Sequence, residues 1–171
     1  MNSPAAFWPH VRGDATMKTA RPLRVLLVGS AGGHLWQLDV LKTWTNDCEC
    51  TWVTFDLPDA RSRLQGERVI WAHHPTTRNI PNLLKNFVLA WRTIRDERPD
   101  LVISCGAGVA VPFFAIAKMH KIKTMFFEVY DRIDTPTMTA RLCRPFSSLM
   151  LAQWPEQQQL YPEAITIGTL A

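Results

Sequence analysis

The chain has 171 residues, of which 47% are hydrophobic and 20% are charged. This length and composition are typical of one globular domain with a sizeable core, and they argue against a disordered or fibrous protein. The net charge of +4 is modest, and no basic run interleaved with aromatic residues occurs, so nucleic acid is not an expected ligand. The charge suits phosphate-bearing ligands or an anionic lipid surface.

Residues 1–21 hold Pro4, Pro9 and Gly13 without hydrophobic periodicity, so we predict a flexible tail there and a folded domain over residues 22–171. The tail lacks the apolar core of a signal peptide. Four cysteines are present, and their spacing does not supply two metal-binding pairs, which favours free or buried thiols in a reducing compartment. They are Cys48, Cys50, Cys105 and Cys143.

A glycine-rich turn at residues 29–34 follows a short apolar run, Arg24–Val28, and precedes a segment, 35–44, with leucines at helical spacing. A strand, a glycine turn and a helix start in this order leave backbone N–H groups that stabilise an anion. Glycine also lets a ligand approach the backbone closely. The turn therefore predicts a phosphate or diphosphate site. Its proposed binding residues are Gly29, Ser30, Gly32 and Gly33.

His34 closes this turn and gives it an ionisable group. A neutral imidazole can accept a proton near pH 7, and an imidazolium can pair with phosphate. The alternative is a helix-start residue that is solvated or bonded to a nearby carbonyl. The turn does not match the dinucleotide fingerprint, because Ala31 and His34 stand at two of its positions, and it lacks the lysine of a P-loop.

The rest of the chain alternates between predicted strands and helices. This alternation predicts an α/β fold with one doubly wound, parallel, Rossmann-like sheet. The principal helix is predicted at residues 80–97, with an apolar stripe and basic residues beside it. Further strands are predicted at residues 51–55, 68–72, 101–104, 123–127, 148–152 and 164–167.

The longest apolar stretch, residues 101–119, is divided by a Gly-x-Gly turn, so we predict a strand followed by a helix at 109–120. This helix is apolar nearly all round, which is typical of a helix that is buried or that contacts a membrane or partner. Its neighbouring residues Phe113 and Phe114 are not expected both to point inward.

Ligands of parallel sheets bind beyond the carboxyl ends of the strands, where the turns at 29–34, 104–108 and 128–132 are expected to converge. Glu128 could orient a histidine, bind a sugar hydroxyl or act as a base, and Arg132 suits a bidentate phosphate contact. The alternative is a Glu128–Arg132 ion pair that only fixes the turn. Gly106 and Gly108 are further candidates for phosphate binding.

Five motifs in this order resemble those of the PssD-type acceptor subunits of split bacterial glycosyltransferases for capsule and exopolysaccharide. They are Gly29–His34, Ser104–Gly108 leading into Val111–Phe114, Glu128–Arg132, Arg144–Phe146 and Gln153–Gln157. The eukaryotic relative is the membrane-anchoring subunit of the enzyme that adds the second N-acetylglucosamine to dolichyl diphosphate. A more distant likeness is to the single-chain N-acetylglucosaminyl transferase of peptidoglycan precursor synthesis. The resemblance covers about residues 22–168.

The resemblance implies a GT-B glycosyltransferase that is divided between two polypeptides, with this chain equivalent to the N-terminal half. In this family the half binds a polyprenyl-diphosphate-linked saccharide, and a separate small subunit binds the UDP-sugar. The implied reaction is an inverting sugar transfer in polysaccharide biosynthesis, which needs both subunits. The candidate sugars are N-acetylglucosamine, glucose, galactose and glucuronic acid.

The resemblance also assigns roles to individual residues. The Gly32-Gly33-His34 segment would hold the acceptor diphosphate, His34 matches the candidate base, and Glu128 matches a residue that positions the acceptor or supports that base. The helix at 109–120 is expected close to the membrane or partner. No metal and no cofactor are expected, because GT-B enzymes stabilise the leaving diphosphate with helix N-termini and basic side chains.

Residues 1–21 depart from the eukaryotic subunit, because they cannot form its N-terminal membrane-spanning helix. We therefore expect a peripheral attachment to the cytoplasmic face of the membrane through apolar surface and positive charge. Two other functions stay open. One is a non-catalytic scaffold that recruits a complete enzyme to the membrane. The other is a dinucleotide-dependent enzyme in which Asp56 binds a ribose hydroxyl.

Overall fold

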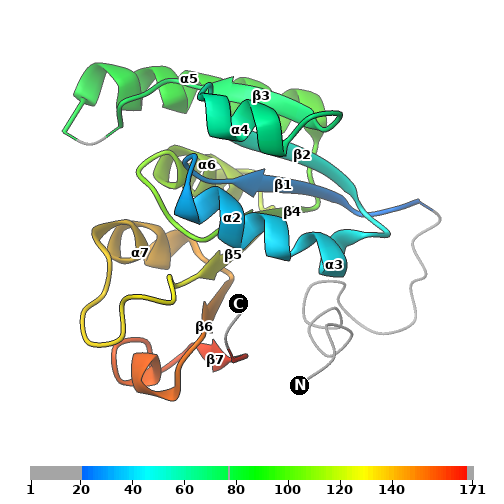
Figure 1. Cartoon of the computed structure of the whole chain (residues 1–171). Helices are drawn as coiled ribbons and strands as arrows, with labels where there is room; N and C mark the ends of the chain where they lie inside the picture. Colours follow the sequence, from blue (N-terminus) through cyan, green and yellow to red (C-terminus); the bar gives the residue numbers. More distant parts are fainter. Residues whose placement is uncertain (1–20, 77, 169–171) are drawn as a thin grey trace.

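In the computed structural model, which describes residues 21–76 and 78–168, seven parallel strands form one sheet with helices on both faces (Figure 1). The order is β3-β2-β1-β4-β5-β6-β7, and every neighbouring pair is parallel. This confirms the predicted α/β class and doubly wound sheet. The strands are β1 (Arg24–Val28), β2 (Glu49–Phe55), β3 (Arg68–Ala72), β4 (Leu101–Ser104), β5 (Lys123–Phe127), β6 (Leu149–Ala152) and β7 (Ile165–Thr166).

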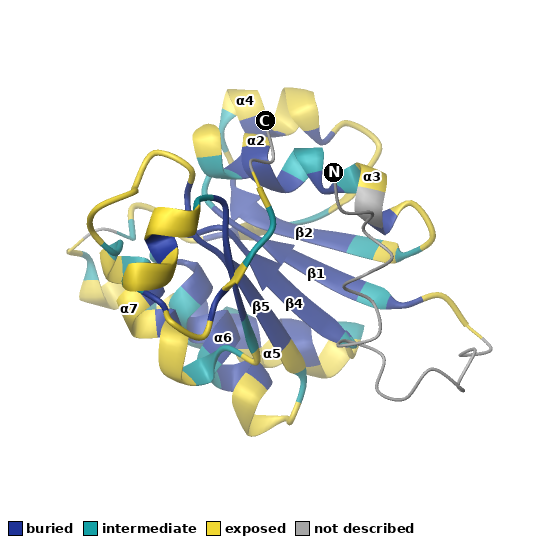
Figure 2. Ribbon diagram, turned by 90° about the horizontal axis from the view of Figure 1, so that it is seen from below, coloured by how far each residue is buried: buried dark blue, intermediate teal, exposed yellow. Residues whose placement is uncertain are grey.

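The helices form two layers, which enclose the buried strands in Figure 2. One layer holds α2 (Gly33–Val40), α3 (Lys42–Thr45) and α4 (Pro58–Arg63). The other holds α5 (Ile80–Glu97), α6 (Ala110–Met119) and α7 (Met138–Cys143). Two short 3-10 helices, η2 (Arg144–Phe146) and η3 (Pro155–Gln159), flank β6. None of the helices in the described part of the chain is long and apolar enough to cross a membrane.

Each face of the sheet has its own hydrophobic core, because successive side chains of a strand point to opposite faces. Leu26 and Val28 of β1 belong to the core under α5 and α6, whereas Val25 and Leu27 belong to the core under α2 and α4. All four side chains are buried. The nearly continuous apolar run of β1 is thus explained by burial on both faces.

The predicted elements agree with the structure except at a few ends. The predicted helix over 35–44 is divided at Leu41 into α2 and α3, and the hydroxyls of Thr43 and Thr45 there bond to nearby backbone carbonyls. Such bonds compete with a regular helix. Strand β2 starts two residues early because Glu49 and Cys50 pair with β1.

Helix α6 is largely buried, which corrects the expectation for its two phenylalanines. Phe113 and Phe114 are both fully buried. The helix packs between the sheet and its neighbours α5 and α7, and Phe114 meets Phe126 of β5 edge-on, with ring centroids 5.9 Å apart. The apolar character of α6 therefore reflects core packing, and its last residues, Lys118 and Met119, are exposed.

Candidate functional site

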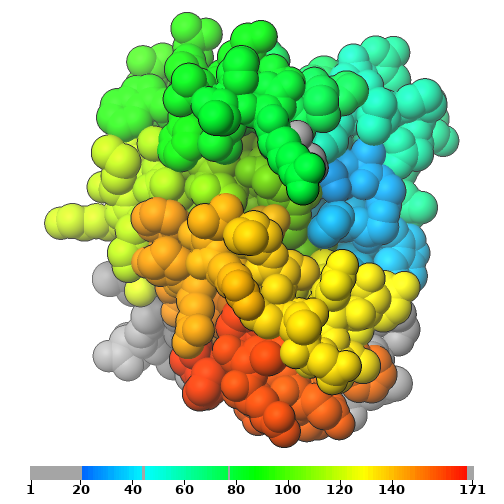
Figure 3. Space-filling model, turned by 90° about the vertical axis from the view of Figure 1, so that its left-hand side faces the viewer, coloured from blue at the N-terminus to red at the C-terminus, as the bar shows by residue number. Residues whose placement is uncertain are grey.

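The turns after β1, β4 and β5 lie at the carboxyl edge of the sheet, where the strand order reverses between β1 and β4. Figure 3 shows the turn after β1 (blue) beside the segment after β5 (yellow) on this face. A hollow of about 300 Å³ lies here. It is lined by Gly33, His34, Gln37, Val129, Tyr130, Asp131, Arg132 and Thr137.

His34 stands at the first turn of α2 and is packed between two of these turns. Its Nδ1 lies 3.0 Å from Ser30 Oγ, and its backbone carbonyl accepts a hydrogen bond from Cys105 Sγ at 3.0 Å. The imidazole lies on Gly106, so close that a Cβ built on this glycine would be 2.7 Å from Nε2. The prediction that these two turns converge is therefore confirmed.

The surroundings of His34 favour a neutral ring. Burial lowers the pKa of His34 below its ordinary value, and the nearby charge of Asp131 opposes this change in part. A neutral imidazole in a hollow at the edge of the sheet is able to take a proton from a ligand. The geometry therefore suits a general base.

Gly106 is needed here for space as well as for its backbone conformation. We expect Gly106→Ala to displace the His34 ring, because its Cβ would meet Nε2 and Cδ2 at 2.7 and 2.8 Å, and its φ is +134°. The matched control is Gly66→Ala, at φ +85° with no atom within 4 Å of the new Cβ. Both changes also introduce backbone strain, because each glycine has a positive φ that residues with a Cβ rarely adopt.

Titration of the histidines by NMR distinguishes the two variants. In Gly106→Ala the pKa of His34 should rise toward its ordinary value, because the displaced ring becomes better solvated. In Gly66→Ala the titration of His34 should match the wild type. Equal titration curves in the wild type and both variants would show that Gly106 does not hold this ring in place.

Glu128 follows β5 and is fully buried. Its carboxylate accepts hydrogen bonds from the Tyr161 hydroxyl, from Thr137 Oγ1 at 3.2 Å and from the Val129 N–H at 3.0 Å. Burial raises the pKa of the carboxyl, and the hydrogen bonds oppose this rise. The side chain thus holds the segment that lines the hollow, whereas it does not itself line the hollow.

The alternative ion pair between Glu128 and Arg132 does not occur among the described residues, because the carboxylate is engaged elsewhere. Arg132 lines the hollow instead. Its carbonyl accepts a hydrogen bond of 2.9 Å from Gln157 Nε2.

Two buried glutamines fix the turn after β5, and their roles were not predicted from the sequence. Gln157 Nε2 donates to the carbonyls of Val129 and Arg132, each at 2.9 Å. Gln153 Nε2 donates to the carbonyl of Glu128 at 2.9 Å. Both residues belong to the Gln153–Gln157 motif, which was the signal available in the sequence.

The glycines of the first turn divide into different roles. Gly33 lines the hollow beside His34. Gly32, at φ +76°, donates its N–H to Asp59 Oδ2 at 2.7 Å, so a carboxylate occupies an N–H group that was predicted to bind phosphate. Gly29 is close-packed, because a Cβ there would lie 2.8 Å from Leu38 Cδ1.

Gly108 also has a packing role. A Cβ there would lie 3.1 Å from Thr76 Oγ1, in the segment that leads from β3 to α5. Of the residues predicted to bind phosphate, Gly33 and Arg132 thus share the hollow with His34. Ser30 reaches it through its contact with the imidazole.

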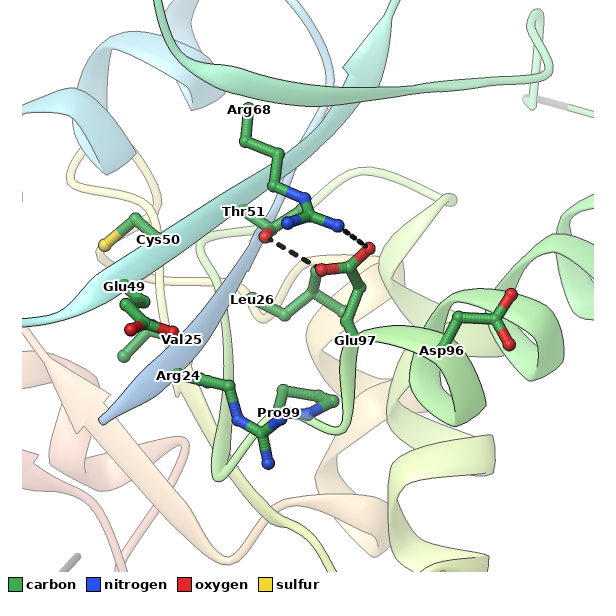
Figure 4. A pocket seen from close by; sticks show the side chains of 10 residues that line it. All are labelled: Arg24, Val25, Leu26, Glu49, Cys50, Thr51, Arg68, Asp96, Glu97 and Pro99. Atoms are coloured by element: carbon green, nitrogen blue, oxygen red, sulfur yellow. Dashed lines mark hydrogen bonds and ion pairs between the residues drawn. The ribbon is translucent and has the colours of Figure 1, made fainter. Parts of the chain in front are cut away.

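A second hollow, of about 460 Å³, lies at the amino ends of β1, β2 and β3 (Figure 4). Some of its polar groups bond to one another: Arg68 binds the Glu97 carboxylate at 2.8 Å, and Thr51 Oγ1 donates to the same carboxylate at 3.4 Å. This hollow is at the opposite edge of the sheet from His34. We therefore place the candidate site at the carboxyl edge.

The described residues contain no group of three or more His, Cys, Asp or Glu side chains that could hold a metal ion. Asp56, the residue that a dinucleotide-binding enzyme would use for a ribose, instead pairs with Arg61 at 2.5 and 2.7 Å. No disulfide joins the described cysteines, and burial raises the pKa of Cys143 to about 12.

The Rossmann-like sheet has the fold of one domain of GT-B proteins of known structure. Among solved structures, Acinetobacter baumannii MurG matches with a TM-score of 0.67 and 17% identity, over 79% of this chain and 43% of that one. The UDP-N-acetylglucosamine 2-epimerase of Rickettsia bellii matches with a TM-score of 0.70 and 13% identity, over 88% and 46%. Both likenesses show the fold.

The family model described as "Oligosaccharide biosynthesis protein Alg14 like" matches residues 60–170, so the chain belongs to this family. The human UDP-N-acetylglucosamine transferase subunit ALG14 is 25% identical over 114 residues, 63% of this chain and 52% of that protein. This confirms the resemblance to the family of the eukaryotic subunit.

A bacterial relative comes from Oceanobacillus iheyensis. It is the UDP-N-acetylglucosamine–N-acetylmuramyl-(pentapeptide) pyrophosphoryl-undecaprenol N-acetylglucosamine transferase, 32% identical over 81 residues, 47% of this chain and 22% of that protein. The chain thus spans about half or less of the length of these curated relatives.

Proposed function

We propose that this chain is the acceptor-binding half of a glycosyltransferase related to the UDP-N-acetylglucosamine transferases. The observation that carries the proposal is the half-buried His34, packed against Gly106 at the switch point of a single Rossmann-like sheet. Membership of the Alg14-like family supports it. A second polypeptide supplies the site for the UDP-sugar, and the product is a precursor in polysaccharide biosynthesis.

In the proposed reaction His34 is the general base. The mechanism uses the tautomer in which Nδ1–H donates to Ser30 Oγ, 3.0 Å away, because the lone pair on Nε2 is then available for the proton of an acceptor hydroxyl. The hydroxyl oxygen then attacks the anomeric carbon of the UDP-sugar, and the bond between this carbon and UDP breaks. UDP leaves with the bonding electrons, the anomeric carbon is inverted, and Asp131 stabilises the imidazolium.

The acceptor is a saccharide on a polyprenyl diphosphate. Its diphosphate lies at Gly33 and Arg132, which share the hollow with His34. A phosphate oxygen that also reached the Gly32 N–H would displace the Asp59 carboxylate. Ser30 and Gly106 contact the imidazole of His34, and Glu128 is a positioning residue that holds the segment after β5.

The proposal is tested by reconstitution. The chain is co-expressed with the donor-binding protein encoded beside it, and transfer from UDP-N-acetylglucosamine to a polyprenyl-diphosphate-linked saccharide is measured. We expect transfer with both proteins and none with either alone. A partner that is fully active alone would favour the scaffold function, and no transfer to any lipid-linked acceptor would contradict the glycosyltransferase role.

We further propose that α5 carries the peripheral membrane contact. Ile80, Leu84, Val88 and Trp91 follow one another at helical spacing and are 69%, 61%, 53% and 44% exposed. Met119 at the end of α6 is exposed as well, and the rings of Trp91 and His120 lie 5.1 Å apart, centroid to centroid.

Basic side chains flank this apolar stripe, which suits an anionic lipid surface. They are the exposed residues Lys85, Arg92, Arg95, Lys118 and Lys121. The stripe is an exposed face of α5, which packs beside α6 in the same layer, so in this proposal α5 contacts the membrane rather than the largely buried helix that the sequence suggested.

Trp91→Glu is expected to weaken binding to vesicles that contain phosphatidylglycerol by about 10–100-fold. The reason is that an aromatic ring that inserts into the lipid is replaced by a negative charge that anionic lipid repels. The matched control is Trp71→Glu, since Trp71 is similarly exposed, 38% against 44%, but lies on β3 at the edge of the sheet. Sedimentation with vesicles measures both. Equal binding by the two variants would place the contact elsewhere.

A further inference from the structure

Gln37 lies on α2, one turn after His34, and lines the same hollow. Its side chain is only 3% exposed. No hydrogen-bond partner of its Oε1 is found in the described part of the chain, although this atom is buried. A buried amide oxygen without a partner costs free energy, so such groups call for a reason.

Packing does not supply that reason. Leu35 and Leu38 on α2 belong to the core and are fully buried, whereas Gln37 lines the hollow beside His34. The other two buried glutamines behave differently, because Gln153 and Gln157 both bond to backbone groups around the turn after β5. Gln37 holds no loop in this way.

We propose that Gln37 binds a hydroxyl or amide group of the acceptor saccharide and so positions the attacking hydroxyl at His34. A carboxamide has an accepting oxygen and a donating nitrogen, and a sugar hydroxyl can bond to either. The hollow offers further polar groups beside it, at Thr137 and Asp131. The inference rests on the proposed function, and it assigns recognition of the sugar, rather than of the diphosphate, to Gln37.

The test compares two probes by calorimetry with the purified chain: farnesyl-diphosphate-linked N-acetylglucosamine and farnesyl diphosphate alone. Gln37→Met keeps the length of the side chain and removes its amide. We expect it to weaken binding of the saccharide probe by about 5–10-fold and to leave binding of farnesyl diphosphate unchanged. Gln159→Met, at an exposed glutamine of η3, should bind both probes like the wild type.

Thermal unfolding controls for folding. Gln37→Met should be at least as stable as the wild type, because the unpaired oxygen is removed. If this variant unfolds, Gln37→Asn retains the amide in a shorter side chain and should give the same selective loss. Equal binding of the saccharide probe by wild type and Gln37→Met would overturn the inference alone. A wild type that binds neither probe would overturn the proposed function together with it.

Discussion

Replacing His34 by alanine is expected to lower the rate of sugar transfer by the reconstituted enzyme by about 10²–10⁴-fold. The variant removes the only described histidine that lines the hollow at the carboxyl edge of the sheet. The fold should persist, because the imidazole packs on a loop outside the two hydrophobic cores. Initial rates with UDP-N-acetylglucosamine and a lipid-linked acceptor measure the effect.

The matched control is His73→Ala, since His73 is exposed and contributes its backbone, rather than its ring, to the bonds with Asn86. This control should keep the wild-type rate. If His34→Ala also kept it, His34 would not be the base. A loss of activity that paralleled a loss of folded protein would equally count against a chemical role.

The pH dependence of kcat/KM gives an independent check on His34. Because burial lowers the pKa of His34 below its ordinary value of 6.5, the acid limb of the profile should lie below pH 6.5. Asp131→Asn removes a charge that raises this pKa, so the limb should move to still lower pH. The folded state resists protonation here, so its stability should fall as pH drops below about 6.5.

Replacing Glu128 by alanine is expected to destabilise the fold by about 2–4 kcal/mol, which lowers Tm by about 5–15 °C. The change leaves the Tyr161 hydroxyl and the Val129 N–H without their acceptor in a buried region. Thermal unfolding measures the loss. Glu156→Ala, at an exposed glutamate, should stay within about 0.5 kcal/mol of the wild type.

Glu128→Gln separates charge from shape. The amide keeps the volume and one acceptor, so most of the stability should remain. Since burial raises the pKa of Glu128, its carboxyl favours the folded state below pH 4.5, and this contribution is lost as pH rises through the folded pKa. In the glutamine variant, the free energy of unfolding should not show this dependence on pH. The role of the buried Glu128 hydrogen bonds would be contradicted if the glutamine variant kept the wild-type pH dependence of stability. It would also be contradicted if the alanine variant were as stable as the wild type.

Local patterns in the sequence were sufficient to predict the strands and the longer helices, whereas α4, α7 and the two 3-10 helices were not predicted individually. Apolar runs followed by glycine predicted β1 and β4. The apolar stripe predicted a helix with the same bounds as α5, Ile80–Glu97. The burial of Phe113 and Phe114 was not predictable in this way. It depends on which helices pack beside α6, and that is set by the strand order.

In the candidate site, too, local patterns predict some features, whereas others depend on tertiary packing. His34 and the turns at the carboxyl edge follow from the order of strand, glycine turn and helix. The contacts that shape the site join residues far apart in sequence: Asp59 to Gly32, Gln157 to Val129, and Tyr161 to Glu128. No periodicity indicates such pairs, because each depends on how two loops are brought together by the sheet.

Calorimetry on the isolated chain with two ligands decides most directly whether it is an acceptor-binding half. We expect farnesyl-diphosphate-linked N-acetylglucosamine to bind, with affinity reduced in a variant that lacks Arg132, and UDP-N-acetylglucosamine not to bind. Binding of UDP-N-acetylglucosamine, with no binding of the lipid-linked saccharide, would contradict the assignment and make this chain the donor half instead.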